Sequence, residues 1–184
     1  MHQREMATVT NPLKSLKLSS HQIGAHQLTP NTSIQHKPLM IYHQAFPPKI
    51  SASAIESHLT KIGVVTPQWR YTMYSRSHFH STAHEVLCVY SGSARLCFGG
   101  ESNPERFEPL LESGDVIVVP AGVAHRLMED VSGHFSMVGS YPKGKNWDMC
   151  YGESGEEEKI KGIANLGWFQ KDPIYGDEGP VLDI

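Results

Sequence analysis

The sequence predicts an all-β fold, a barrel or a sandwich, within a single domain. From about residue 69 onward, apolar and polar residues alternate with a period of two, as they do in strands that bury one face. The candidate strands are short and are separated by Ser-Gly, Gly-Gly and Ser-Gly-Asp turn signals. A chain of 184 residues also has the length of one domain rather than two. Short strands joined in this way favour an all-β architecture over alternating strands and helices.

The N-terminal part of the chain differs from the rest in composition. Residues 1–37 are rich in Ser, Thr, Asn, Pro and His and show little periodicity. We therefore expect a flexible N-terminal arm there, followed by a domain over residues 38–184. The apolar run from Leu39 to Tyr42 predicts the first strand of that domain.

A short helix is expected before the main run of strands. Ser53 and Glu56 have the spacing of a capping box, and Gly63 is placed where a helix commonly ends. Three apolar residues share one face of this helix: Ile55, Leu59 and Ile62. The helix therefore has one side suited to packing against a sheet.

The rest of the chain reads as strands followed by a C-terminal arm. Strands are expected over residues 69–80, 85–90, 94–98, 115–119 and 135–141. The tail from Gly152 is acidic at residues 156–158 and is expected to form a short helix to about Ala164. The residues after this helix resemble a loop.

Composition excludes several classes of function. The 16 Lys and Arg residues are scattered and the formal net charge is -3, so no nucleic-acid partner is expected. No apolar run reaches the length of a membrane span, and the N-terminus lacks the apolar core of a signal peptide. Cys88, Cys97 and Cys150 are odd in number and lack CxxC spacing, which favours a reducing compartment. A cytoplasmic protein without a membrane partner is the expectation.

Two segments carry side chains that can bind a metal ion. His78 and His80 lie two residues apart, so on a strand both imidazoles point to the same face. A turn through residues 81–83 would bring Glu85 back beside them. In the second segment, a run of β-branched residues ends in Pro-Ala-Gly and places His125 at the barrel wall. Imidazoles with one carboxylate are suited to one divalent transition metal such as Fe, Mn, Ni or Zn.

These two segments resemble the two motifs of the cupin family. The first motif, H-x-H-x4-E-x6-G, is matched by His78, His80, Glu85 and Gly92. The second motif, G-x5-P-x-G-x2-H, is matched by Gly114, Pro120, Gly122 and His125. The chain lacks the Gly often found before the first motif and has Glu129 where Asn is frequent, but neither departure removes a ligand.

The resemblance is widest to the small single-domain microbial cupins grouped as YjlB-like, and it runs from about Leu39 to the C-terminus. It implies a single-domain cupin jelly-roll β-barrel with a short N-terminal helix and a C-terminal arm. It also implies that His78, His80, Glu85 and His125 ligate the metal.

Three further residues are candidates for roles in catalysis. Tyr74 and Arg76 share the strand face of the motif histidines, so both are expected in or near the cavity. Arg76 can neutralise a carboxylate or enolate of a substrate, and a surface ion pair is an equally good interpretation. Alternation sends His84 to the opposite face from Glu85, which favours a supporting or contact role. The alternative for His84 is a proton carrier beside the metal.

A set of three histidines and one glutamate leaves open coordination positions on an octahedral ion. The cupin resemblance favours a metal-dependent enzyme that acts on a small organic substrate, with non-haem dioxygenase-type chemistry first. The alternatives are a redox-neutral lyase, isomerase or decarboxylase that uses the metal as a Lewis acid, and a non-catalytic metal or small-ligand binding protein. A homodimer that exchanges the segment from Leu39 to Tyr42 is also expected.

Overall fold

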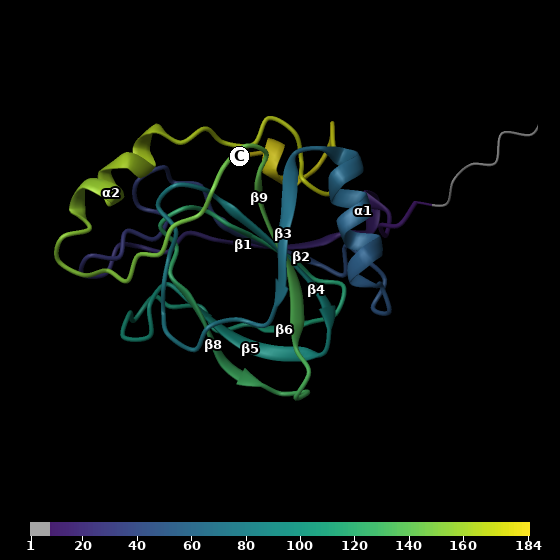
Figure 1. The fold of residues 1–184 in the computed structure, drawn as a ribbon, viewed down its shortest axis with the longest axis horizontal. Coiled ribbons are helices and arrows are strands. Elements are labelled where there is room, and N and C mark those ends of the chain that lie inside the picture. Colours follow the sequence, from purple (N-terminus) through teal and green to yellow (C-terminus); the bar gives the residue numbers. More distant parts are fainter. Residues whose placement is uncertain (1–7) are drawn as a thin grey trace, which may run out of the picture.

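The computed structural model describes residues 8–184 and is built mainly from antiparallel strands (Figure 1). The strands are β1 (Lys17–His21), β2 (Leu39–His43), β3 (Val65–Tyr71), β4 (Glu85–Ser91), β5 (Ser93–Phe98), β6 (Leu110–Glu112), β7 (Val116–Val119), β8 (His125–Asp130) and β9 (Ser136–Pro142). The α-helices are α1 (Ala52–Ile62) and α2 (Glu157–Gly162), with short 3-10 helices at Leu13–Ser15, Ile163–Asn165 and Pro180–Leu182. The all-β prediction is confirmed.

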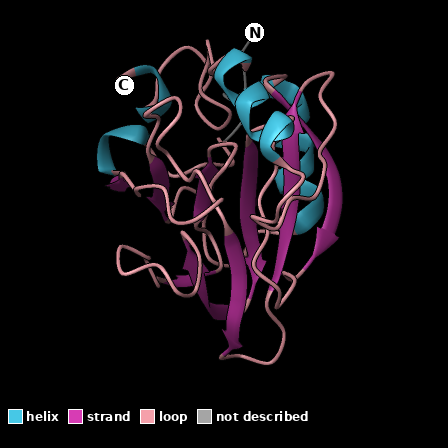
Figure 2. Ribbon diagram, turned by 90° about the vertical axis from the view of Figure 1, so that its left-hand side faces the viewer, coloured by secondary structure: helices cyan, strands magenta, loops and turns pink. Residues whose placement is uncertain are grey.

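The strands form two sheets. One sheet has six strands in the order β1-β2-β7-β4-β9-β3, and the other has three strands in the order β6-β5-β8. The small sheet lies below the large one in Figure 1, and the strands run along the length of the molecule in Figure 2. Apolar side chains from both sheets, such as Leu87 and Leu96, meet in one cluster between them. The two sheets therefore enclose a common core.

The large sheet is buried on both faces, because alternate residues of each strand enter different cores. In β2, Leu39 and Ile41 face the small sheet, whereas Met40 and Tyr42 belong to a second core. Helix α1 and the C-terminal segment cover this second face. Burial on both sides explains why β2 and β7 read as continuous apolar runs rather than alternating ones. The segment that we expected to exchange between subunits is thus paired with β1 and β7 of the same chain.

Helix α1 lies where the sequence predicts it, but its N-cap differs. Ser51, not Ser53, accepts a hydrogen bond from the Ala54 amide. Ser53 and Glu56 instead receive hydrogen bonds from Arg70 of β3. The capping-box pattern therefore reflects a contact with the neighbouring strand. Gly63 ends the helix with a φ of 76°, a left-handed conformation that glycine adopts without strain.

The expectation of a flexible arm over residues 1–37 needs correction for the part that the structure describes. Strand β1 pairs with β2 along its whole length, and Asn31 is buried. The Asn31 side chain donates hydrogen bonds to the carbonyls of Gly24 and Gly99, and its oxygen accepts one from Ala124. Side-chain hydrogen bonds of this kind stabilise a polar segment that lacks apolar periodicity. Residues 1–7 lie outside the described residues, and a domain boundary at residue 37 stays a prediction.

The C-terminal segment is attached to the large sheet through Asp172, whose side chain is fully buried. Its carboxylate accepts a hydrogen bond of 2.6 Å from the Tyr42 hydroxyl of β2. It also accepts hydrogen bonds from the amides of Ile174 and Tyr175, at 2.8 and 3.0 Å. The segment therefore folds around one buried carboxylate.

The expected strand over residues 69–80 is correct only for its first three residues. Strand β3 ends at Tyr71, and the chain then follows a loop before β4 begins at Glu85. Within this loop His78 forms an isolated pair with His125. Alternation between Tyr74, Arg76 and His78 is consequently lost. Within residues 8–184, no helix has the length and apolar character needed to cross a membrane.

Candidate metal centre

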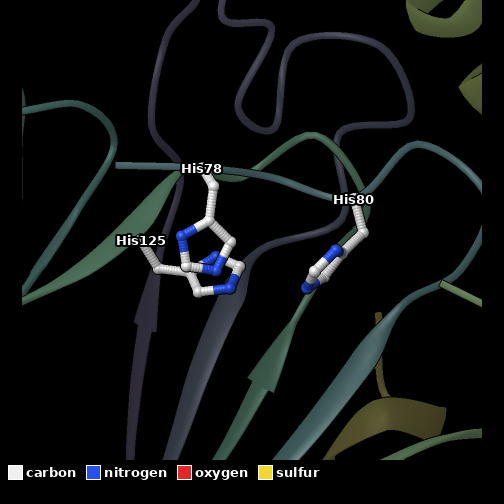
Figure 3. Close-up of side chains that lie close together, drawn as sticks. All are labelled: His78, His80 and His125. Carbon is white, nitrogen blue, oxygen red and sulfur yellow. The ribbon is translucent and has the colours of Figure 1, made fainter. Parts of the chain in front are cut away.

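Three histidines from different parts of the fold converge at one end of the core (Figure 3). His78 and His80 lie in the loop between β3 and β4, and His125 begins β8. Reciprocal backbone hydrogen bonds pair His78 with His125, which brings their ring centroids to 4.3 Å. One ligand atom from each of the three residues lies within 4.8 Å of the others, and all three side chains are buried. Such a group can hold a metal ion.

Main-chain carbonyls fix the tautomer of each of these imidazoles. The Nδ1 atom of His78 lies 2.8 Å from the Arg76 carbonyl oxygen, and that of His125 lies 2.9 Å from the Val123 carbonyl. Nδ1 of His80 lies 2.5 Å from the carbonyl of Asp148. A carbonyl oxygen can only accept, so each Nδ1 carries the proton and donates it. In the neutral imidazole, Nε2 then has the free lone pair that a metal requires.

The Glu85 carboxylate is held beside two of these imidazoles by a chain of hydrogen bonds. The Tyr141 hydroxyl donates to Glu85 Oε1 at 2.7 Å, and the Trp69 indole donates to the Tyr141 hydroxyl at 3.0 Å. The other oxygen, Oε2, lies 3.3 Å from His80 Nε2 and 3.1 Å from His125 Nε2. One carboxylate oxygen is therefore satisfied by the protein, and the other faces the histidines.

The contacts of Glu85 Oε2 require a positive charge. This buried oxygen has no hydrogen-bond donor among the described residues, and its two nearest neighbours are nitrogen lone pairs. Burial alone would raise the pKa of Glu85, but His80 and His125 hold it well below its usual value. Burial opposes the charge on His80 too, yet Glu85 raises the pKa of His80. A divalent cation would meet the same demand, so the donor set fits a metal ion.

His78 is neutral because burial and a neighbouring histidine both disfavour its charged form. Burial, with His125 beside it, lowers the pKa of His78 to about 3. A neutral imidazole with a free Nε2 is the form that binds a metal ion.

A second loop braces the histidines from behind. Phe79 and Cys150 exchange backbone hydrogen bonds of 2.9 Å, which fixes the loop at residues 146–150 against the motif. The Asp148 carboxylate accepts hydrogen bonds from the Ser81 amide and hydroxyl, at 2.7 and 2.5 Å. Thr82 donates to the Asn146 carbonyl at 2.6 Å. These contacts position the Asp148 backbone carbonyl so that it accepts the hydrogen bond from His80 Nδ1.

The three histidines and Glu85 form the buried end of a cavity of about 260 Å³. The wall is otherwise largely aromatic and thioether in character, with Trp69, Tyr71, Met73, Tyr74, Trp147 and Met149. Tyr71 and Tyr74 are about half exposed and mark the mouth. A small molecule that enters through the mouth would therefore meet the histidine cluster at the far end.

The structure separates the three candidate catalytic residues that the sequence indicates. Tyr74 lines the cavity, with its ring centroid 5.6 Å from that of His78. The Arg76 side chain does not line the cavity: it is exposed, pairs with Glu153 at 2.7 Å and lies over the Tyr151 ring. The exposed ion pair agrees with the surface interpretation of Arg76. A role at the mouth stays a prediction, because Arg76 lines a neighbouring pocket together with Tyr74, Trp147 and Met149.

His84 lies outside the cavity, as alternation predicts. Its Nδ1 accepts a hydrogen bond from the Ala121 amide, and its Nε2 donates to the Gly167 carbonyl at 3.0 Å. Burial lowers the pKa of His84 to about 4, so the ring is neutral near pH 7. These contacts connect β4 to the C-terminal segment, which supports the structural interpretation over a proton carrier.

Several residues of the site have no signal in the two sequence motifs. Tyr141 lies at the end of β9, while Trp147, Asp148 and Met149 belong to the loop after it. The only sequence hint is that this stretch lies within the wider similarity to YjlB-like cupins. Pairing of β9 with both β3 and β4 brings it to the site.

Replacing Tyr141 with phenylalanine is expected to lower the free energy of unfolding by about 1–3 kcal/mol. The change removes the donor to the buried Glu85 carboxylate and the acceptor for the partly buried Trp69 indole. Urea unfolding of the metal-free protein measures the effect. Tyr71→Phe is the matched control, because the Tyr71 side chain is exposed at the mouth. Equal losses in the two variants would contradict a specific role for the Tyr141 hydroxyl.

Comparison with known proteins agrees with the motifs. The family model described as cupin matches residues 43–130. Uncharacterized protein YjlB of Bacillus subtilis (strain 168) is 34% identical over 148 residues, which is 80% of this chain and 85% of that protein.

Solved structures with lower similarity include three proteins of different kinds. A deletion mutant of the Bacillus subtilis oxalate decarboxylase OxdC is 14% identical, with 66% of this chain and 26% of that chain covered and a TM-score of 0.35. RmlC from Streptococcus suis in complex with dTDP-D-xylose is 12% identical, with 69% and 70% covered and a TM-score of 0.36. Procruciferin, an 11S globulin from Brassica napus, is 14% identical, with 62% and 22% covered and a TM-score of 0.34.

This chain spans 22% of the procruciferin chain and 26% of the OxdC chain, but most of the length of YjlB. The chain belongs to the cupin family and is a YjlB-like member of it.

Proposed function

We propose that this cupin is a metal-dependent enzyme that acts on a small organic molecule. One divalent transition metal is held by the Nε2 atoms of His78, His80 and His125, together with Glu85. The observation that carries this proposal is the unpaired Glu85 Oε2, which is buried against two imidazole lone pairs. Fe, Mn, Ni and Zn all accept this mixture of nitrogen and oxygen ligands.

Dioxygenase-type chemistry is the reaction that the cavity supports best. A bound Fe(II) ion would supply the activation of dioxygen next to the substrate. The chain itself supplies a largely apolar wall that excludes water and orients the substrate towards the histidine end. Tyr141 is not free to move a proton, because its hydroxyl is hydrogen-bonded to both Glu85 and Trp69. Burial beside Glu85 raises the pKa of Tyr141, so its hydroxyl keeps its proton.

A redox-neutral lyase, isomerase or decarboxylase is the second candidate, and Tyr74 is the residue that favours it. These reactions need a side chain that gives or takes a proton near the substrate. Arg76 and His84 lie outside the cavity, whereas Tyr74 is next to His78 at the mouth. Tyr74 is therefore the one of our three candidates that can serve this chemistry.

The test combines metal analysis with oxygen uptake. We expect Fe(II)-loaded protein to consume dioxygen in the presence of a substrate from a screen of small phenols, enols and keto compounds. Tyr74→Phe should leave this rate within about threefold, because dioxygenase chemistry does not need its proton. Conversion without oxygen, lost in Tyr74→Phe, would favour the redox-neutral reaction. Tight binding without conversion under any metal would identify a binding protein. A homodimer stays a prediction.

A further inference from the structure

We infer the substrate class of this cavity: a compact molecule with an apolar body, whose oxygen donors are confined to one end. A negatively charged group at the far end of the molecule is not accepted. This inference rests on the proposed metal site, because the oxygen donors are placed at the histidine end. It follows from the distribution of polar groups along the cavity.

The body of the substrate meets apolar surface. Between the histidine end and the mouth, most of the wall consists of three kinds of side chain, indole, phenol and thioether, and Arg70 and Thr72 complete it. Trp147 and Tyr141 stack with ring centroids 6.1 Å apart, and Met73 is buried nearby. Aromatic and thioether surfaces bind rings and alkyl groups well and do not replace the hydration of a charged group.

The hydrogen-bonding groups of the inner wall are paired with each other, except for the buried Thr72 hydroxyl, which has no partner among the described residues. The Trp69 indole donates to Tyr141, and Tyr141 donates to Glu85. Using either group for a substrate would leave its present partner unsatisfied in a buried place, which is unfavourable. The inner wall therefore offers a substrate shape, apolar contact and one neutral hydroxyl, that of Thr72, but no free charged group.

The positive charges near the cavity are also engaged elsewhere. Arg70 lines the cavity, but its guanidinium hydrogen-bonds to Glu56 and Ser53 of helix α1. Arg76, beyond the mouth, pairs with Glu153 and lies 3.7 Å above the ring of Tyr151. A carboxylate or phosphate at the far end of a substrate would thus be desolvated without a free cation. Only the metal end of the cavity can receive negative charge.

The test uses two probes that share one end and differ at the other. Ethylcatechol and dihydroxyphenylacetate present the same pair of oxygen donors, but the second compound carries a carboxylate where the first has a methyl group. Zn(II)-loaded full-length protein is used, so that no oxidation occurs, and binding is measured by isothermal titration calorimetry. We expect ethylcatechol to bind about tenfold tighter or more.

Two variants test whether the wall causes this preference. Trp147→Ala should weaken the binding of ethylcatechol about three- to tenfold and leave the zinc content unchanged, because the indole is wall and not ligand. Trp168→Phe is the matched control, since Trp168 packs on His84 and Phe169 away from the cavity. Met149→Lys, at a half-buried wall position, should reduce or reverse the preference by supplying the missing cation.

The outcomes separate the two proposals. Equal or tighter binding of the carboxylate probe, or no binding of either probe, to protein that contains zinc would overturn the substrate class and leave the metal site intact. A Trp147→Ala variant that retains full affinity would likewise overturn it. Protein that retains no zinc would overturn the proposed function and this inference together, and metal analysis of each sample identifies that case.

Discussion

Replacing His125 with alanine is expected to lower the metal content of the protein from about one equivalent per chain to less than about a tenth. His125 supplies one of three imidazoles whose ligand atoms lie within 4.8 Å of one another. Its Nε2 is 3.1 Å from Glu85 Oε2. Losing it leaves the carboxylate with fewer compensating partners as well as one ligand fewer. Elemental analysis by mass spectrometry, on protein purified without a tag or chelator and then reconstituted, measures the result.

The control for this experiment is His134→Ala, because His134 is exposed and its imidazole hydrogen-bonds to Ser91, away from the histidine cluster. It should keep the full metal content. His80→Ala should behave like His125→Ala, and circular dichroism should show that all three variants keep their strands. Full occupancy in either cluster variant would remove that histidine from the ligand set. Absence of metal from the parent protein after reconstitution would refute the centre itself.

The second large effect is expected at Asp172, which is not part of the histidine cluster. Asp172→Ala should lower the free energy of unfolding by about 3 kcal/mol or more. It leaves the Tyr42 hydroxyl and the amides of Ile174 and Tyr175 buried without an acceptor. The C-terminal segment should then detach from the large sheet before the rest of the fold. Denaturant unfolding and limited proteolysis of the C-terminal segment measure these two consequences.

Asp177→Ala is the matched control for Asp172→Ala. Asp177 is exposed and pairs with Lys171 at the surface, an interaction that contributes less than about 1 kcal/mol. Its removal should change stability little and leave the proteolysis pattern unchanged. If the two variants lose similar stability, the network around Asp172 is not what fixes the segment.

Much of the fold can be predicted from the sequence, because its strands bury alternate residues on fixed faces. Strands β4, β5, β7 and β9 lie within one or two residues of their expected bounds. Strand β1 was missed because it is a polar edge strand, and its sequence KLSSH carries no apolar signal. Its place is set by pairing with β2, a contact that local periodicity does not reveal.

The candidate site also has a part that the sequence predicts and a part that it does not. His78, His80, Glu85 and His125 are brought together as the motifs imply. The residues that support them come from distant segments, and their roles depend on main-chain atoms. Asp148, for example, positions His80 through its backbone carbonyl. The amino-acid type at a position does not predict a contact of this kind.

Arg76 shows how a loop in place of an expected strand changes the position of a side chain. Parity along a strand would put its side chain beside His78. The loop after β3 has no such alternation, so the guanidinium points to Glu153 instead. A fold class can therefore be right while the strand alternation expected for one segment is absent.

The imidazole protons of the cluster are all held by peptide carbonyls, and this has a consequence for how the protein can change over evolutionary time. A substitution deletes a side chain but leaves the peptide group in place. The backbone conformation therefore determines the orientation of the three imidazoles. Most neighbouring side chains can be exchanged without changing it. Relatives can alter the cavity wall, and with it the compound they recognise, without first rebuilding the metal centre. The same centre can then serve many substrates in succession.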